Sequence, residues 1–272
     1  MPTIIKKKSL KKKSVSFSED EVTLMLYQMT KDVSEMFGKF NIQYWADGGT
    51  FLGAVRHKGI IPWDDDVDVG ILEKDYKKLQ NLKKEIQKYG LRINYEKGFG
   101  NLMKISSLKS PNLVKKDSKE GENGWGFPWI DVFWYKKVGK RIEYGEKLWR
   151  EEWPNNWFNL SNFYPLKPAL FGATCINIPN NSVQYLKRNY SKNVLKEGIF
   201  YGAHEEGGID LDEGQKVIVK KFVPAKTFFI PKELLKILDT LNVFQLKYLA
   251  NGLNIKTSQK KSKLIEQIKI NA

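Results

Sequence analysis

Cysteine and histidine are scarce in this 272-residue chain, which has one cysteine, Cys175, and two histidines. One cysteine cannot form an intramolecular disulfide, and so few sulfur and imidazole ligands exclude a Cys/His zinc site of the finger type. No apolar run approaches the roughly 18 residues that span a membrane, and no apolar stretch of a secretory signal follows the first lysines. The sequence therefore predicts a soluble protein of a reducing compartment, the cytoplasm.

Positive charge is concentrated at the two ends of the chain. The net charge is +15. Residues 1–13 hold six lysines and no acid, and residues 232–272 hold eight lysines against three acids. The centre is nearly balanced. Basic ends attract polyanions of any kind, but a solvated, disordered tail is the prediction for residues 1–17.

Residues 18–231 are predicted to form one α+β domain. Ser18 and Glu21 make a capping box, and apolar residues then recur at helical spacing until Gly38. Short apolar or alternating segments follow and indicate strands. The predicted strands cover residues 42–45, 67–71, 91–95, 102–106 and 129–135, the helices residues 50–56, 75–89 and 182–190, and the loops residues 57–65, 115–126 and 198–214.

Residues 232–272 are predicted to be a separate helix–loop–helix module that begins after Pro231. Helices are expected at residues 234–241, 243–251 and 262–270, with a basic loop before the last of them.

Four of the five residues from Asp64 to Asp68 are aspartates. Clustered carboxylates repel and raise one another's pKa unless a cation neutralises them. Asp66 and Asp68 are two residues apart on a predicted strand, so their side chains share one face. Hard oxygen ligands in that arrangement suit Mg²⁺ or Mn²⁺, with phosphates completing the coordination.

Asp131 is a single carboxylate inside the apolar segment 129–133, where a buried charge needs a partner. If this strand lies beside the acidic one, Asp131 becomes a third metal ligand or a general base. Two alternatives stay open for the acidic run. One is a solvated turn, and the other is a Ca²⁺ loop, although Val69 stands where that loop requires glycine.

The residues before the acidic run favour phosphate binding. They are not a dinucleotide fingerprint, because Thr50 takes the place of its second glycine. A strand followed by two glycines and a helix still directs backbone N–H groups of the helix N-terminus at a ligand. Cationic side chains follow, each of which is alternatively an ordinary surface residue. The predicted phosphate-binding set is Gly48, Gly49, Thr50, Arg56, His57 and Lys58.

The run from Gly48 to Asp68 resembles the signature of the LicD family, which includes bacterial phosphocholine transferases and fukutin-type ribitol-phosphate transferases. Residues 129–133 and 185–190 resemble later motifs of that family, with Ser191 where it often has glycine. The resemblance extends over roughly residues 35–205. It implies a nucleotidyltransferase-type fold, a small mixed sheet with flanking helices and three metal-binding acids. In this chain those acids are Asp66, Asp68 and Asp131.

The resemblance implies a metal-dependent phosphotransferase that moves a phospho-alcohol from a CDP-linked donor to a glycan hydroxyl. Mg²⁺ or Mn²⁺ held by Asp66 and Asp68 would neutralise the leaving phosphate, and Asp131 would accept the hydroxyl proton. Asp64 and Lys104 complete the predicted substrate-binding set, Lys104 being alternatively an exposed strand lysine. A nucleotidyltransferase that uses an NTP donor is the alternative enzyme. Sugar stacking or core packing is expected of Trp149, Trp153 and Trp157.

The C-terminal module resembles a SAP motif, a helix–loop–helix known for binding DNA. Phosphate contacts are then expected from four lysines of its loop and last helix. The alternative is a helical cap that packs on the main domain. A nucleic-acid-associated protein without enzymatic activity is therefore the third hypothesis. The four lysines are Lys256, Lys260, Lys261 and Lys263.

Overall fold

The computed structural model describes most of the chain from residue 19 to residue 200 and parts of the C-terminal segment. The predicted basic tail, the segment 115–125, the loop 201–214 and the predicted boundary at Pro231 lie outside the described residues. The described residues are 19–61, 64–110, 126–172, 174–200, 217–219, 238–240, 243, 246, 250, 255–256 and 258–271.

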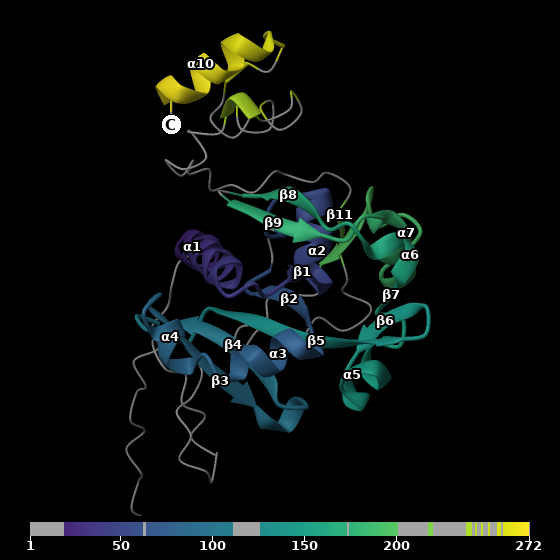
Figure 1. Ribbon diagram of the computed structural model, residues 1–272. Coiled ribbons are helices and arrows are strands. Elements are labelled where there is room, and N and C mark those ends of the chain that lie inside the picture. Colours follow the sequence, from purple (N-terminus) through teal and green to yellow (C-terminus); the bar gives the residue numbers. More distant parts are fainter. Residues whose placement is uncertain are drawn as a thin grey trace, which may run out of the picture.

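A seven-stranded mixed sheet forms the centre of the molecule (Figure 1). The main order is β1-β2-β5-β4-β3, and β6 pairs with both β5 and β7. The β2–β5 pair is parallel, and the other described pairs of this sheet are antiparallel. The predicted α+β class with a mixed sheet is confirmed. The strands are β1 (Tyr44–Ala46), β2 (Val67–Leu72), β3 (Leu91–Glu96), β4 (Leu102–Ser107), β5 (Trp129–Val138), β6 (Arg141–Tyr144) and β7 (Trp157–Asn159).

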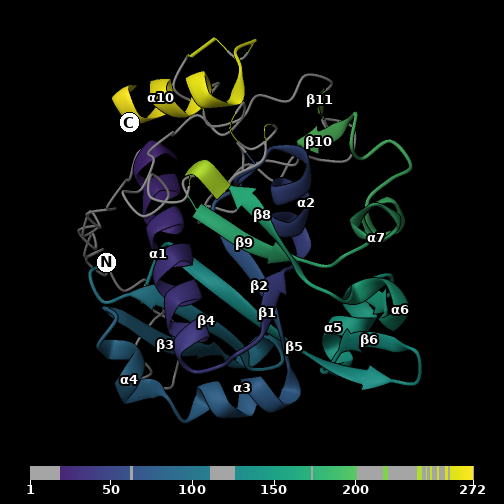
Figure 2. The same ribbon diagram turned by 45° about the horizontal axis from the view of Figure 1, so that its top comes forward.

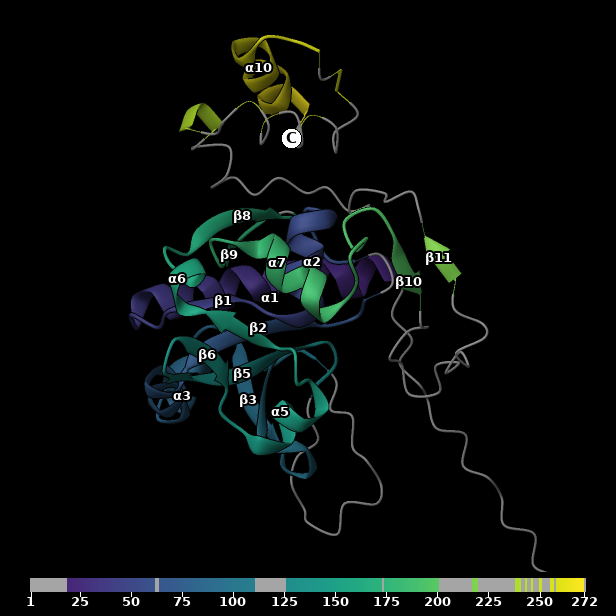
Figure 3. The same cartoon turned by 90° about the vertical axis from the view of Figure 1, so that its right-hand side faces the viewer.

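The long helix α1 (Glu19–Lys39) crosses one face of the sheet (Figure 2). Its buried residues include Leu26, Val33 and Met36, which lie on one stripe at helical spacing. The hairpin of β8 (Lys167–Phe171) and β9 (Thr174–Ile178) lies beside α1, and its strand β9 packs on both α1 and β1 (Figure 3).

Shorter elements complete the described fold, and helix α2 packs on β2 beside the acidic run. They are α2 (Gly48–Arg56), α3 (Glu73–Gln80), α4 (Lys83–Gln87), the 3₁₀ turn η1 (Lys97–Phe99), α5 (Lys147–Glu152), α6 (Leu160–Phe163), α7 (Ser182–Asn189), β10 (Gly198–Phe200) and β11 (Val217–Val219).

Two predictions of local structure are wrong. The single helix expected over residues 75–89 is two helices, α3 and α4, because Asn81 ends the first of them. Its side-chain amide donates to the carbonyl of Lys77 at 3.1 Å, a local bond that competes with the helix. The expected loop 198–214 begins instead with β10, which pairs with β11.

Residues 145–180 show little periodicity in their sequence, yet they fold into two helices and three strands. Each of these elements is only three to six residues long. Such short elements do not complete enough helical turns or strand alternations to show a period.

Helix α10 (Lys261–Asn271) confirms the last helix expected in the C-terminal segment. Buried apolar residues of α10 and of the preceding described residues form a cluster of their own. This cluster shares no residue with the main core. The module as a whole stays a prediction. None of the described helices is both long enough and apolar enough to cross a membrane. The cluster consists of Leu238, Leu246, Ala250, Leu264, Ile265 and Ile268.

Gly70 on β2 lies directly opposite Trp45 on β1. A Cβ atom at Gly70 would lie 2.4 Å from Nε1 of the Trp45 indole, which is fully buried. Because the ring has no space to retreat, we expect Gly70→Ala to lower the free energy of unfolding by about 2–3 kcal/mol. Urea denaturation measures the change. Gly38→Ala is the control, since its Cβ would meet nothing within 4 Å, and equal losses in the two variants would contradict the steric argument.

Candidate active site

Two of the predicted acids lie opposite each other on neighbouring parallel strands. Asp68 on β2 pairs in register with Asp131 on β5, so the strand pairing that the sequence left conditional is present. Asp66 lies just before β2. One oxygen from each of Asp66, Asp68 and Asp131 falls within 4.8 Å of the other two. Three carboxylates from two strands therefore converge on one point.

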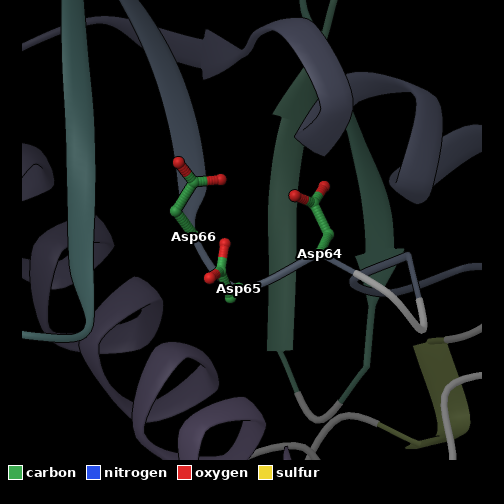
Figure 4. Close-up of side chains that lie close together, drawn as sticks. All are labelled: Asp64, Asp65 and Asp66. Carbon is green, nitrogen blue, oxygen red and sulfur yellow. The ribbon is translucent and has the colours of Figure 1, made fainter. Parts of the chain in front are cut away.

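Asp64 and Asp65 extend this acidic cluster along the segment that leads into β2 (Figure 4). Oxygens of Asp64, Asp65 and Asp66 also lie within 4.8 Å of one another. Because Asp68 belongs to β2, the run cannot form the Ca²⁺ loop considered above. Asp66 and Asp68 are only partly exposed and Asp131 is buried, which also excludes a solvated turn.

The carboxylates destabilise one another's charged forms. Burial raises the pKa of Asp66 well above its ordinary value, and the charges of Asp68 and Asp64 raise it further. Burial and the charge of Asp131 likewise raise the pKa of Asp68. A cation placed among these oxygens would relieve both effects. The donor set, carboxylate oxygens alone, fits a hard divalent ion such as Mg²⁺ or Mn²⁺.

A cleft of about 640 Å³ opens over the acids. Its lining combines charged side chains with aromatic, aliphatic and amide ones. Such a combination suits a ligand that carries both a phosphate and an uncharged ring or polyol. The predicted residues that line the cleft are Gly48, Gly49, Arg56, Asp64, Asp66, Asp68, Lys104 and Asp131, and their neighbours include Glu96, Phe99, Trp129, Tyr144, Trp153, Asn156, Tyr185 and Tyr190.

Gly48 and Gly49 begin helix α2 and lie against the acids. A Cβ atom at Gly48 would lie 2.8 Å from Oδ2 of Asp68, and Gly48 also has a φ of +47°. A Cβ atom at Gly49 would lie 2.8 Å from Oδ2 of Asp64. Only glycine lets the start of the helix approach the carboxylates this closely. The N-terminus of α2 therefore faces the same cleft as the acids, as a phosphate cradle requires.

Thr50 does not line the cleft, although the sequence grouped it with the phosphate-binding residues. Its hydroxyl oxygen accepts a hydrogen bond from the backbone N–H of Asp68 at 2.7 Å. Thr50 thereby ties helix α2 to β2, the strand that carries Asp68.

Removal of this bond is expected to leave the buried N–H of Asp68 without its partner. We expect Thr50→Val, which keeps the shape of the side chain, to lower the free energy of unfolding by about 1–3 kcal/mol. Thermal and urea denaturation check it. Thr50→Ser retains the hydroxyl and should lose less, and a Thr50→Val protein as stable as the wild type would contradict the role.

The three basic residues predicted to bind phosphate at the end of α2 have different positions. Arg56 lines the cleft, and its guanidinium donates to the carbonyls of Val194 at 3.0 Å and Glu197 at 3.3 Å. Burial lowers the pKa of Arg56 to about 10, so it keeps its charge at neutral pH. His57 is buried, and its Nε2 accepts from Arg56 Nε at 2.9 Å. Lys58 donates to the carbonyl of Val55. Of the three, only Arg56 lines the cleft.

Lys104 lies in the cleft next to Asp131 and is not an exposed strand lysine. It is 4% exposed and pairs in register with Asp131 across β4 and β5. Its ammonium is 2.8 Å from Asp131 Oδ1 and 3.3 Å from Glu96 Oε2. Burial alone would lower the pKa of Lys104, but these carboxylates raise it above its ordinary value. Sequence reasoning missed Glu96, which no motif marks.

The three tryptophans considered for sugar stacking divide among different environments. Trp149 is fully buried and belongs to the core. Trp157 lies between two guanidinium groups, with Arg141 3.9 Å and Arg188 3.6 Å from its ring centre. Trp153 is 39% exposed and lines the cleft. Only Trp153 of the three is placed to stack on a ligand in this cleft.

Asp47 is fully buried behind the cleft and accepts hydrogen bonds from three tyrosines. Tyr135 and Tyr144 donate to its Oδ2 at 2.6 and 3.1 Å, and Tyr185 donates to its Oδ1 at 3.3 Å. Asn156 bonds to all three phenols: its Oδ1 accepts from Tyr135 and Tyr185, and its Nδ2 donates to Tyr144. Asp47 immediately precedes Gly48-Gly49, so this network holds the start of α2. The sequence did not reveal it, because the tyrosines follow Asp47 by 88, 97 and 138 positions.

The four lysines considered for DNA binding are exposed on the C-terminal segment. Lys260 and Lys256 belong to the loop, and the other two belong to α10. Lys261 also donates to the carbonyl of Asp239 at 3.1 Å. Contact with DNA stays a prediction for all four lysines, which are Lys256, Lys260, Lys261 and Lys263.

Residues 41–181, more than half of the chain, match the family described as LicD/FKTN/FKRP, nucleotidyltransferase domain. The protein RP689 of Rickettsia prowazekii, itself uncharacterized, is 33% identical over 181 residues, which are 66% of this chain and 59% of that protein. The chain thus spans less than two thirds of that relative's length.

Two named transferases match a shorter stretch. The lipopolysaccharide cholinephosphotransferase LicD of Haemophilus influenzae is 50% identical over 40 residues, which are 15% of each chain. The human ribitol 5-phosphate transferase FKRP is 50% identical over 42 residues, which are 15% of this chain and 8% of that protein.

Proposed function

Because the chain belongs to the LicD/FKTN/FKRP nucleotidyltransferase family, we propose that it is a metal-dependent phosphotransferase. In this proposal it moves a phospho-alcohol from a CDP-linked donor to a glycan hydroxyl. The observation that carries the proposal is the convergence of Asp66, Asp68 and Asp131 beside the Gly-Gly start of α2 in one cleft. The names of the LicD and FKRP relatives supply the class of group that is transferred.

Asp66 and Asp68 are the residues that would hold Mg²⁺ or Mn²⁺, with Asp131 beside them. When bound, the ion neutralises charge on the donor diphosphate. Gly48 and Gly49 direct backbone N–H groups at the phosphates, and the Arg56 guanidinium adds a fixed positive charge to the same wall of the cleft. Together these groups would orient the phosphorus.

Asp131 would accept the proton of the attacking hydroxyl. Burial raises its pKa, although the nearby ammonium of Lys104 opposes this effect, so it is a stronger base than an ordinary aspartate. Trp129 Nε1 donates to Asp131 Oδ2 at 3.2 Å and orients the carboxylate. The partly exposed Trp153 offers a flat apolar surface to a sugar ring.

The test is incubation of the full chain with CDP-choline, CDP-ribitol and the four NTPs, each with Mg²⁺ or Mn²⁺. Release of CMP from a CDP-linked donor is the expected result, and added metal chelator should stop it. Release of pyrophosphate from an NTP, with no CMP from any CDP-linked donor, would reject the phosphotransferase in favour of a nucleotidyltransferase.

A further inference from the structure

Lys104 is surrounded on three sides by groups that hold its ammonium in place. Asp131 accepts from it with Oδ1 at 2.8 Å and with Oδ2 at 3.1 Å. Glu96 Oε2 lies at 3.3 Å, and the ring centre of Trp129 lies at 4.4 Å. The side chain is 5% exposed. Its charge is therefore a fixed feature of the cleft, in contrast to the mobile charge of a surface lysine.

Asp131 connects this ammonium to the acidic cluster. Both of its oxygens accept from Lys104, and Oδ2 also accepts from Trp129. The same carboxylate contributes an oxygen to the group formed with Asp66 and Asp68. One carboxylate thus binds the lysine and also lies within 4.8 Å of the other two acids.

Sites that use two divalent ions place them about 3.5–4 Å apart and join them through a shared carboxylate. Here a second ion bridged by Asp131 would lie next to a buried ammonium that binds the same carboxylate. Like charges so close together in a site of low dielectric repel strongly. Among the described residues that line the cleft, Lys104 and Arg56 carry positive charge, and Lys104 is the one that contacts a metal-site acid.

We propose that Lys104 takes the place of a second divalent ion, so that the acidic cluster of this protein binds one metal ion. Lys104 is a positioning residue, because it acts through Asp131 and orients that carboxylate toward Asp66 and Asp68. The inference rests on the metal dependence proposed above. This role of Lys104 differs from direct phosphate contact, because Lys104 would set the number of bound metal ions even when no donor is present.

The experiment counts Mn²⁺ bound to the full chain, from the electron paramagnetic resonance signal of free Mn²⁺ during a titration without nucleotide or phosphate. One ion per chain is expected for the wild type and for Lys104→Arg, which keeps the charge. Two are expected for Lys104→Met, which keeps the stem on Trp129 and removes the charge. Lys83→Met is the matched control, because Lys83 also lies over an aromatic ring, Tyr95 at 5.1 Å, and does not line the cleft.

Two ions on the wild-type chain would overturn the inference, and so would one ion on a folded Lys104→Met chain. A second ion bound by Asp64 and Asp65 would also overturn it, because the wild-type chain would then bind two ions. Lys104→Met/Asp131→Asn removes the buried pair together and should return the count to one. No bound Mn²⁺ on any chain would reject the proposed metal dependence itself, so the two failures are distinguishable.

Discussion

Replacement of either Asp66 or Asp68 by asparagine is expected to lower donor turnover by more than about 100-fold. Each carboxylate supplies a charged oxygen to the point where three acids converge. The loss of groups that only support metal ligands already costs about 10–100-fold, so the loss of a ligand should cost at least as much. The measurement is CMP release at saturating Mg²⁺. Asp32→Asn on α1, outside the cleft, is the control with the same chemical change.

The same variants are expected to be more stable than the wild type when metal is absent. Burial and neighbouring carboxylates raise the pKa of Asp66 well above its ordinary value of 3.8, so the folded protein binds protons more strongly than the unfolded chain. Stability of the metal-free protein therefore falls as pH rises above about 3.8, and Asp66→Asn removes that loss. The melting temperature of the variant should exceed that of the wild type at pH 7, with the difference disappearing toward pH 3.8. A variant that turns over donor like the wild type, or that melts at a lower temperature than the wild type without metal at pH 7, would reject the assignment of Asp66 and Asp68 as metal ligands.

Asp47→Ala is expected to lower the free energy of unfolding by about 1–3 kcal/mol. Tyr144 loses the carboxylate that accepts the hydrogen bond of its hydroxyl in a buried setting, where a hydrogen-bonding group left unpaired costs roughly 1–3 kcal/mol. Asn156 Oδ1, in contrast, can still accept from Tyr135 and Tyr185. Tyr144 and Tyr185 also line the cleft, so KM for the donor should rise. Urea unfolding and steady-state kinetics give the two quantities.

Asp47→Asn is the matched comparison. It keeps an oxygen that accepts from the tyrosines and removes only the charge. Burial raises the pKa of Asp47, which means that the folded state already disfavours the charge. The asparagine variant should therefore lose much less stability than the alanine variant. Equal losses would show that the charge matters and the hydrogen bonds do not.

The acidic run and the two glycines could be assigned from the sequence because their chemistry is local. Asp66 and Asp68 are neighbours along the chain, and alternation with Val67 and Val69 was enough to predict a shared face. Asp131 was noticeable as a charge inside an apolar strand, and the parallel pairing of β2 and β5 then brought it to Asp68. The signals that succeeded were those in which spacing along the chain determines spacing in the structure.

Thr50, His57 and Lys58 show where that reasoning stops. Thr50 lies in α2, and His57 and Lys58 follow its last residue, so their side chains point in different directions. Thr50 bonds to the backbone of Asp68, His57 is buried against Arg56, and Lys58 bonds to the carbonyl of Val55. Proximity in sequence placed them near the site, whereas the packing of α2 decided that Arg56 lines it and these three do not.

By itself the sequence determined the fold class, the acidic cluster and the glycine start of α2, since each follows from residues close along the chain. Only the tertiary structure decided the partners of the buried charges. Asp47 meets tyrosines from β5, β6 and α7, and Lys104 meets Glu96 from β3 and Asp131 from β5. A buried charge must be paired or hydrogen-bonded, and strand order and register decide which distant residues are there to do it.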